Sequence, residues 1–349
     1  MVFMTKESQE VSVNLRRTLI PIFIVTAIII IAVVLLLQEN IGGIVTALQN
    51  ANYLFILLAF IIYFSSAFFW AARWRIGLFA LGKNASMRNL FPIIWGSMFI
   101  NNMTPLNRAG GDPIGRPYLL KKTSGIRFRM GFASVVAEQL FQIPVVLFLL
   151  AMGLILRVQM TANPGLVSIA TVVISLSLAI VLVPFFILLF GKKEFSSKIT
   201  GFLTKILKFF RREADPTKIL KTVEDFRVSA RKIINSKHNA AWMMGFSAAL
   251  WILDLVRISL ILYALGINIS LPMLFLASTL PQIAGLVPLL PGGIGAVEVT
   301  MVSVFMWFGV SPVLALSATL IERSMSFVFS TLIGAGALSY LGIKIWTKS

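Results

Sequence analysis

The sequence predicts an all-α, polytopic integral membrane protein with about six spanning helices, two broken re-entrant helix pairs and an inverted repeat. Of its 349 residues, 58% are hydrophobic and only 13% are charged, whereas soluble domains carry roughly 25% charged residues. The apolar residues gather in charge-free runs such as 18–37 and 52–72. About 20 apolar residues in a helix span the hydrocarbon core of a bilayer, and these runs lack the alternation of barrel strands.

Six segments are long and apolar enough to cross a bilayer: 18–37, 52–72, 130–156, 165–190, 239–265 and 313–342. Two further regions are apolar but broken. Residues 90–100 are too short to cross and run into a polar stretch that starts at Asn101. Residues 271–308 are interrupted by prolines and glycines, and each proline removes a helix donor and clashes with the preceding turn. We therefore predict two re-entrant helix pairs, the second of which turns at 288–293.

Lysine and arginine side chains predict the orientation in the membrane. Nearly all of them fall in residues 1–17, 73–88, 108–129 and 191–238. The intervening loops contain a single basic residue, Arg157. Because cytoplasmic loops carry the excess of basic residues, both termini are predicted to be cytoplasmic, in the cell membrane. The first broken region then dips in from the cytoplasm and the second from outside.

The order of spans and broken regions predicts two halves within a single membrane domain, 1–349. Residues 18–156 and 165–342 contain the same series of elements in opposite orientation, an arrangement typical of transporters with a midplane site. In the cytoplasmic loop 191–238, apolar residues recur at helical spacing among lysines and arginines. Such basic amphipathic helices lie on anionic headgroups, although a loop that only fixes orientation and solubility fits the pattern equally well.

Composition excludes several other classes of function. The net charge is +18, from 31 Lys and Arg against 13 Asp and Glu. Loop orientation accounts for this excess, so nucleic acid is not an expected partner. The chain has no cysteine and one histidine, His238, so a metal site built from these residues is not expected, nor is any cofactor. A Gly-x-x-x-x-Gly-Lys-Ser/Thr motif is also absent from the sequence, so transport would be passive or coupled to an ion.

Ionisable residues inside apolar segments are the first candidates for a functional site. They are Glu138, Asp254, Arg257, Glu298, Glu322 and Arg323. Each unpaired charge at a helix centre costs roughly 2.5–3.5 kcal/mol on insertion scales, so these groups are expected to pair or to face a cavity. Asp254 and Arg257 are three residues apart and share a helix face; the pair has either a structural or a functional role. Glu138, Glu298 and Arg323 are expected to find partners in three dimensions.

Two glycine-rich turns predict an anion site. The first, within 105–116, combines Gly110 and Gly111 with Asp112, which is expected to cap a new helix, and with Arg108 and Arg116. Glycines let backbone amides approach a ligand, and helix N-termini and arginines suit phosphate. The second turn, 291–295, leads into the helix that bears Glu298. The candidate substrate-binding residues are Asn101, Asn107, Arg108, Gly110, Gly111, Asp112, Arg116, Glu138, Pro291, Gly292, Gly293, Gly295, Glu298 and Arg323.

These motifs resemble those of the transmembrane region of the lysylphosphatidylglycerol synthase family, a flippase-like domain that also occurs as stand-alone archaeal and bacterial proteins. The resemblance covers nearly the whole chain. It rests on 101–116, Ala137-Glu138, Pro291 to Gly295 with Glu298, and Arg323. The chain departs from the family's pattern at Asp112, Gln139 and Gln142, where Glu, Arg and often Asp are usual.

The resemblance implies a protein that moves a lipid between leaflets. Family members that synthesise aminoacylated lipids append a soluble transferase domain, which we do not expect here because the chain ends soon after the last predicted span. The expected partners are membrane lipids with an anionic headgroup or a polyprenyl phosphate. Two alternatives stay open: a membrane-embedded transferase acting in lipid-linked glycan assembly, and a helical scaffold without chemistry of its own.

Overall fold

The computed structural model describes residues 41–104, 111–160, 228, 231–232, 235–285 and 291–343, all of which belong to helices or to the turns between them. The predicted spans 18–37 and 165–190 and most of the loop 191–238 lie outside these residues, as do Asn107, Arg108 and Gly110. The described part contains four helices long and apolar enough to span a membrane. They correspond to the other four predicted spans, so the all-helical, polytopic fold class is confirmed.

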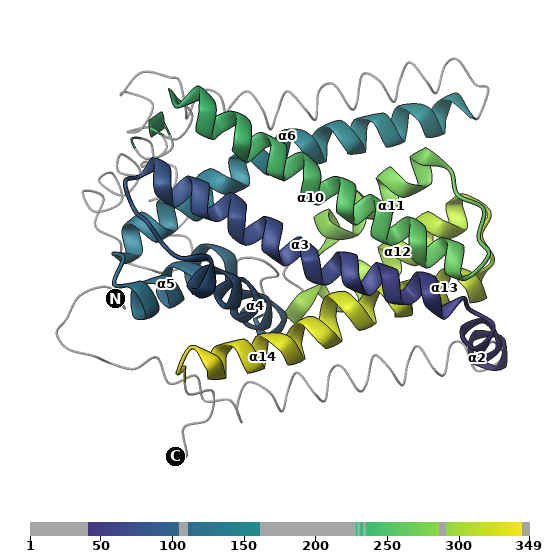
Figure 1. Cartoon of the computed structure of the whole chain (residues 1–349). Helices are drawn as coiled ribbons and strands as arrows, with labels where there is room; N and C mark the ends of the chain where they lie inside the picture. Colours follow the sequence, from purple (N-terminus) through teal and green to yellow (C-terminus); the bar gives the residue numbers. More distant parts are fainter. Residues whose placement is uncertain are drawn as a thin grey trace, which may run out of the picture.

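Two long helices form the centre of the bundle. A short helix α2 (Ile41–Gln49) precedes α3 (Tyr53–Ala80), and α3 packs along α10 (Lys237–Ala264) with the opposite direction (Figure 1). Asn52 and Ser236 cap the first turns of these helices with their side chains. The exposed side of α3 is apolar from Leu54 to Phe68, as expected for a surface that faces lipid.

The first broken region forms a helix pair at one end of the bundle. Helix α4 (Met87–Met103) enters from this end, and a π-helical segment (Gly111–Gly115) followed by α5 (Arg116–Ser124) returns to it. We call this the first end of the bundle; it lies at the left of Figure 1. Helix α4 is longer than the apolar run 90–100 that predicts it, and Asn101 and Asn102 belong to the helix instead of breaking it.

The second broken region forms a matching pair that enters from the opposite end, the second end. Helix α11 (Leu271–Ala284) runs inward, a short 3₁₀ turn (Pro291–Gly293) follows, and α12 (Ala296–Trp307) runs back. Asn52 N–H donates to Ala264 O at 2.8 Å, which places the start of α3 beside the end of α10 at this same end. The two predicted half-helices are confirmed, whereas residues 288–290 of the predicted turn lie outside the described residues.

The remaining long helices connect the two ends. Helix α6 (Phe128–Gln159) begins beside α5, and its Arg157 donates to Trp307 O at 3.2 Å at the second end. The last span consists of α13 (Pro312–Arg323), a π-helical segment (Ser324–Phe329) and α14 (Ser330–Tyr340). Helix α14 packs along α4 back to the first end (Figure 1).

Corresponding helices of the two halves begin at a constant spacing. Helices α3 and α10, α4 and α11, and α6 and α13 start 184 residues apart (237 − 53, 271 − 87 and 312 − 128). Helices α3 and α10 also have the same length, 28 residues. We propose on this basis that the halves 18–156 and 165–342 are copies of one helical unit in inverted orientation.

Among the described residues, the apolar core consists of two large clusters and a smaller third one. One cluster lies around the first helix pair and includes Trp74, Leu90 and Trp95. Another lies around the second pair and includes Leu276 and Phe305. The tips of the two pairs meet between these clusters, because a Cβ on Gly292 would lie 3.4 Å from the backbone oxygen of Asn102. The middle of the bundle is where the polar side chains collect.

Candidate functional site

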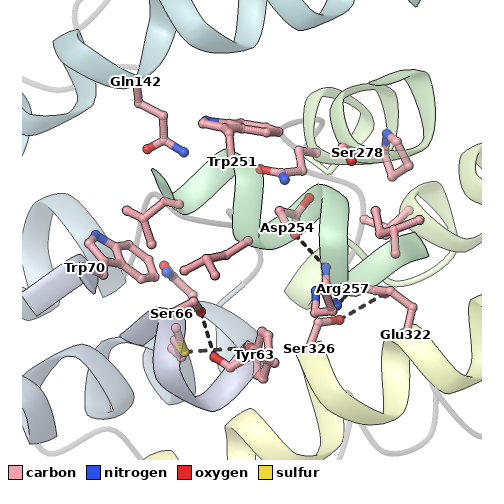
Figure 2. A pocket seen from close by; sticks show the side chains of 18 of the residues that line it. Tyr63, Ser66, Trp70, Gln142, Trp251, Asp254, Arg257, Ser278, Glu322 and Ser326 are labelled. Atoms are coloured by element: carbon pink, nitrogen blue, oxygen red, sulfur yellow. Dashed lines mark hydrogen bonds and ion pairs between the residues drawn. The ribbon is translucent and has the colours of Figure 1, made fainter. Parts of the chain in front are cut away.

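A cavity of about 220 Å³ lies where the two helix pairs meet (Figure 2). This is far more than the ~30 Å³ that one water occupies in the liquid, and just below the ~300–1,000 Å³ of typical small-molecule sites. Its lining comes from both halves of the chain. Among the lining residues are Tyr63, Trp70, Arg73, Asn101, Asn102, Asp112, Gln139, Gln142, Trp251, Asp254, Arg257, Ser278, Gln282, Gly292, Glu322, Arg323 and Ser326.

Glu138 on α6 holds two arginines on the side of the first half. It accepts from Arg73 Nε at 2.8 Å and Nη2 at 2.6 Å, and from Arg116 Nη2 at 2.6 Å. Asp112 Oδ1 lies 3.7 Å from Arg116 Nη1, and the Arg116 guanidinium lies over the ring of Trp74 at 4.3 Å. We call Arg73, Arg116 and Glu138 the first ion cluster; its side chains are no more than 1% exposed.

Arg257 on α10 bridges two carboxylates on the side of the second half. It donates to Asp254 Oδ1 at 2.7 Å and to Glu322 Oε1 at 3.0 Å, and it lies 5.3 Å from the Tyr63 ring centroid (Figure 2). Ser326 donates to the other oxygen of Glu322 at 3.1 Å. We call Asp254, Arg257 and Glu322 the second ion cluster. The predicted pair of Asp254 and Arg257 is confirmed, and Glu322 completes it.

The two clusters have the same spacing in the sequence. Arg73 and Glu138 are 65 residues apart in the sequence, and so are Arg257 and Glu322. The first cluster contains two cations and one anion, whereas the second contains one cation and two anions. An unpaired charge in the bilayer costs free energy. Because the charges within each cluster pair with one another, the bundle can hold charged side chains beside the cavity.

The second glycine-rich turn is held by another ion pair. Arg323 Nε donates to Glu298 Oε1 at 2.6 Å, and its Nη2 donates to Gly292 O at 3.2 Å. The other Glu298 oxygen accepts from Gly295 N–H at 2.7 Å, so Glu298 also caps the start of α12. Gly292, Gly293 and Gly295 have φ of 65°, 68° and 85°, a region that glycine enters without a Cβ clash.

Asn102 fixes the tip of the first helix pair on the last span. Its Nδ2 lies 2.9 Å from Ser330 Oγ and from Thr331 Oγ1, and 3.3 Å from Phe327 O.

The two π-helical segments, Gly111–Gly115 and Ser324–Phe329, also border the cavity, to which they contribute Asp112 and Ser326. π-Helical turns are rare and occur often at functional sites.

The structure brings together most of the predicted site residues that it describes. Residues that line the cavity are Asn101, Asp112, Gly292 and Arg323. Arg116 and Glu138 lie behind this lining in the first ion cluster, and Glu298 lies behind Arg323. Asp112 is the second residue of a π-helical segment and does not precede a helix as its cap. The substrate-binding role of all these residues stays a prediction.

Sequence reasoning missed several residues of the site. The sequence predicts Arg73 in the loop 73–88, but α3 continues to Ala80 and carries Arg73 into the bundle. Trp70, Trp251 and Ser278 were not singled out because aromatic and hydroxyl residues are common in spanning helices. The equal spacing of Arg73 with Glu138 and of Arg257 with Glu322 was available in the sequence as a signal.

The fold and the central polar cavity define a multi-pass membrane protein with two inward-pointing helix pairs. Among the described residues, no group of three His, Cys, Asp or Glu side chains is placed to hold a metal ion. The chain belongs to the family described as the lysylphosphatidylglycerol synthase TM region, which matches residues 22–334. The resemblance predicted from the motifs is thereby confirmed.

Relatives in several archaea are similar over nearly the whole chain. A UPF0104 membrane protein of Methanothermobacter thermautotrophicus is 30% identical over 335 residues, 94% of this chain and 97% of the relative. A UPF0104 membrane protein of Pyrococcus horikoshii is 26% identical over 87% of this chain and 92% of its own. The glycosyltransferase AglD of Haloferax volcanii is 24% identical over 87% of this chain, which covers 51% of AglD. No solved structure was found to match.

Proposed function

We propose that the protein is a lipid translocase that moves an anionic phospholipid or a polyprenyl-phosphate-linked lipid between the leaflets of the cell membrane. The observation that carries the proposal is the cavity at the meeting point of two helix pairs that enter from opposite ends. Paired, Gly/Pro-interrupted helices of this kind border the substrate sites of transporters that alternate access to the two sides of a membrane.

The polar lining supports passage of a headgroup. Three arginines and three carboxyl groups border the cavity. Charged side chains within the hydrocarbon layer destabilise a membrane protein unless they are paired or serve a function. A path lined in this way lets a polar headgroup avoid the acyl chains, while the lipid tails stay outside the bundle. The exposed apolar faces of α3 and α10, which include Phe64 and Ile252, would contact those tails.

We assign recognition of the phosphate first to Arg323 and the turn beside it. The Arg323 side chain is 14% exposed and borders the cavity, and its guanidinium has the planar, bidentate geometry that suits phosphate. The predicted contribution of Arg108 rests on the sequence alone. Arg116 is fully buried against Glu138, so it would act by holding α5 against α6 unless the first ion cluster opens during transport.

A reconstitution assay tests the proposal. Proteoliposomes containing a headgroup- or tail-labelled fluorescent phosphatidylglycerol are treated with dithionite, which bleaches only the outer leaflet. We expect full bleaching with the protein and about half with empty liposomes. Arg323→Gln should slow the transfer about tenfold or more, since a hydrogen bond to a charged group contributes ~1.5–3 kcal/mol. Arg75→Gln, on the exposed side of α3, is the matched control and should leave the rate unchanged.

Two results would contradict the translocase. Wild-type vesicles that bleach no further than empty ones, with both phosphatidylglycerol and a polyprenyl phosphate, would remove it. Equal reductions of the transfer rate in Arg323→Gln and Arg75→Gln would show that transport does not depend on the cavity.

The similarity to AglD favours one alternative, a membrane-embedded transferase in lipid-linked glycan assembly. Only about half of AglD is covered by this chain, so the likeness does not assign the glycosyltransferase reaction to the shared part. Formation of a glycosylated lipid by the purified protein, with a polyprenyl-phosphate donor and loss of product in Asp112→Asn, would favour the transferase over the translocase.

A further inference from the structure

Helix α6 of the first half packs against α11 of the second half between the cavity and the second end (Figure 1). Gln142 on α6 and Ser278 on α11 border the cavity. From Gln142, α6 continues for 15 residues (157 − 142) to Arg157, which is about 22 Å of helix. Helix α11 begins seven residues before Ser278 (278 − 271), at the second end. We call the packed stretch between the cavity and this end the α6–α11 seam.

The α6–α11 seam is apolar and closely packed. A Cβ on Gly153 of α6 would lie 2.9 Å from Leu276 Cδ2 and 3.0 Å from Phe275 Cβ of α11, so the glycine allows the two helices to approach. Leu150 and Leu154, on the same stretch of α6, pack against the apolar cluster that contains Leu276. A polar headgroup cannot cross the closed seam, because a polar group that is buried without a partner costs free energy.

Arg157 fastens the seam at the second end. Its Nη2 donates to Trp307 O at 3.2 Å, and its guanidinium lies 5.0 Å from the Trp307 ring centroid and 5.1 Å from that of Phe308. Trp307 is the last residue of α12, and the last carbonyls of a helix have no partner within it and favour a nearby cation. One arginine thus joins the first half to the second helix pair through an exposed contact.

The corresponding contact of the other helix pair, between α4 and α14, is built from the backbone and from buried groups. A Cβ on Gly334 of α14 would clash with Trp95 O, a backbone atom of α4. At the tip of α4, Asn102 Nδ2 also donates to Ser330 and Thr331 at 2.9 Å. Because these contacts extend along α14 from its first residue, we expect α4 and α14 to move as one body and the α6–α11 seam to separate more easily.

We propose that the α6–α11 seam is the gate between the cavity and the second end, and that Arg157 is the latch that holds this gate closed. The gate opens when Arg157 leaves Trp307 and α6 moves away from the second helix pair, while α4 and α14 stay together. This inference rests on the proposed transport of a lipid headgroup, and it specifies the path between the cavity and the leaflet at the second end.

Thiol labelling measures the gate without any assay of transport. Ser278→Cys is introduced into the chain, which has no cysteine, and membrane vesicles of both orientations are treated with an impermeant maleimide. A separate Asn50→Cys variant, exposed just before α3 at the second end, identifies the vesicles whose second end faces the reagent. Ser278 is only 2% exposed, so it should react slowly.

Replacing the latch should speed this reaction. We expect Arg157→Gln to raise the labelling rate of Ser278→Cys from the second end about fivefold or more, because the variant loses a cation–π contact and a charged hydrogen-bond donor. The matched control is Arg88→Gln, which removes an arginine that donates to the Tyr340 hydroxyl at 3.4 Å between α4 and α14. This control should leave the labelling rate unchanged.

A covalent link tests whether the gate must open during transport. Arg157→Cys and Trp307→Cys are combined and joined by a reducible bifunctional thiol reagent. We expect the link to stop lipid transfer in the vesicle assay and reduction to restore it. The matched pair is Arg88→Cys with Tyr340→Cys, which links α4 to α14 and should leave the transfer rate unchanged.

Three results would overturn the gate. They are equal labelling of Ser278→Cys with and without Arg157→Gln, full transfer by the protein linked between positions 157 and 307, and an equal loss of transfer when positions 88 and 340 are linked. The translocase is judged separately. Faster labelling in Arg157→Gln together with no transfer by the wild-type protein would refute the translocase alone, whereas transfer that the 157–307 link does not slow would refute the gate alone.

Discussion

Replacing Glu138 by glutamine perturbs a fully buried charge in the bundle. The carboxylate is 0% exposed and accepts three hydrogen bonds from Arg73 and Arg116. Glutamine keeps the size but removes the negative charge, and leaves two buried guanidinium groups with Asp112, at 3.7 Å from Arg116, as the nearest carboxylate. Removing one member of a buried ion pair costs about 3–5 kcal/mol, and we expect Glu138→Gln to fall in this range.

The second ion cluster supplies the comparison, because Arg257 and Glu322 have the same sequence spacing as Arg73 and Glu138. Glu322→Gln removes the carboxylate 3.0 Å from Arg257, but Asp254 still accepts from the same guanidinium at 2.7 Å. The cost should be that of one hydrogen bond to a charged group, about 1.5–3 kcal/mol. The difference between the two variants is therefore on the order of 1–2 kcal/mol, although both replace one glutamate by glutamine on a spanning helix.

Unfolding in mixed micelles with increasing dodecyl sulfate, followed by tryptophan fluorescence, measures both free energies. Arg116→Met added to Glu138→Gln removes the excess cation and should recover part of the loss, since apolar replacement of a buried ion pair is often neutral. Two outcomes would show that the charge balance of the clusters does not determine their stability. One is a Glu322→Gln variant that is as unstable as Glu138→Gln, and the other is a further loss of stability when Arg116→Met is added.

Three further predictions concern packing and orientation. Gly334→Ala should destabilise the fold by about 1–3 kcal/mol in the same unfolding assay, because its Cβ would clash with Trp95 O and lie 2.8 Å from Phe99 Cβ. The control Gly336→Ala, whose Cβ would have nothing within 4 Å, should leave the stability unchanged. Equal effects of the two variants would contradict the packing of α4 on α14. Asn102→Ala should cost about 1–3 kcal/mol, since it removes the amide that donates to Ser330 and Thr331; an unchanged unfolding midpoint would show that this contact does not fix the helix tip. Single cysteines at Asn84 and Asn50, in a chain without cysteine, should react with an impermeant maleimide from opposite sides of the membrane, Asn84 from the cytoplasmic side; labelling from one side would refute the predicted topology.

The sequence predicts the helices better than it predicts the polar side chains that pack between them. Long apolar runs locate the spans, and prolines with glycines locate the second helix pair, because these signals act locally. The end of α3 is missed because an apolar run stops where Arg73 begins, whereas the helix continues to Ala80 and ends before Gly82, which has φ of 73°. An arginine inside a span becomes predictable only when its partner is known, and Glu138 lies 65 residues away.

The cavity is predictable only in part, for the same reason. Asn101, Asp112, Gly292 and Arg323 stand out as polar or flexible residues in apolar surroundings, and the structure places all four at the cavity. Trp70, Trp251 and Ser278 do not stand out, since such residues occur throughout spanning helices. Their importance arises from packing: helices from both halves bring them to one space and leave their polar atoms without partners among the described residues.

The π-helical turn in the last span determines where this span can change in length. A π turn accommodates one more residue than an α turn over the same rise. Deleting a single residue between Ser324 and Phe329 would therefore let this segment become regular α-helix while the residues after it keep their places. Ser330 and Thr331 would stay beside Asn102, and Gly334 beside Trp95. A deletion within the regular helix Ser330–Tyr340 would instead turn every later side chain by about 100° around the helix axis and remove it from its neighbours.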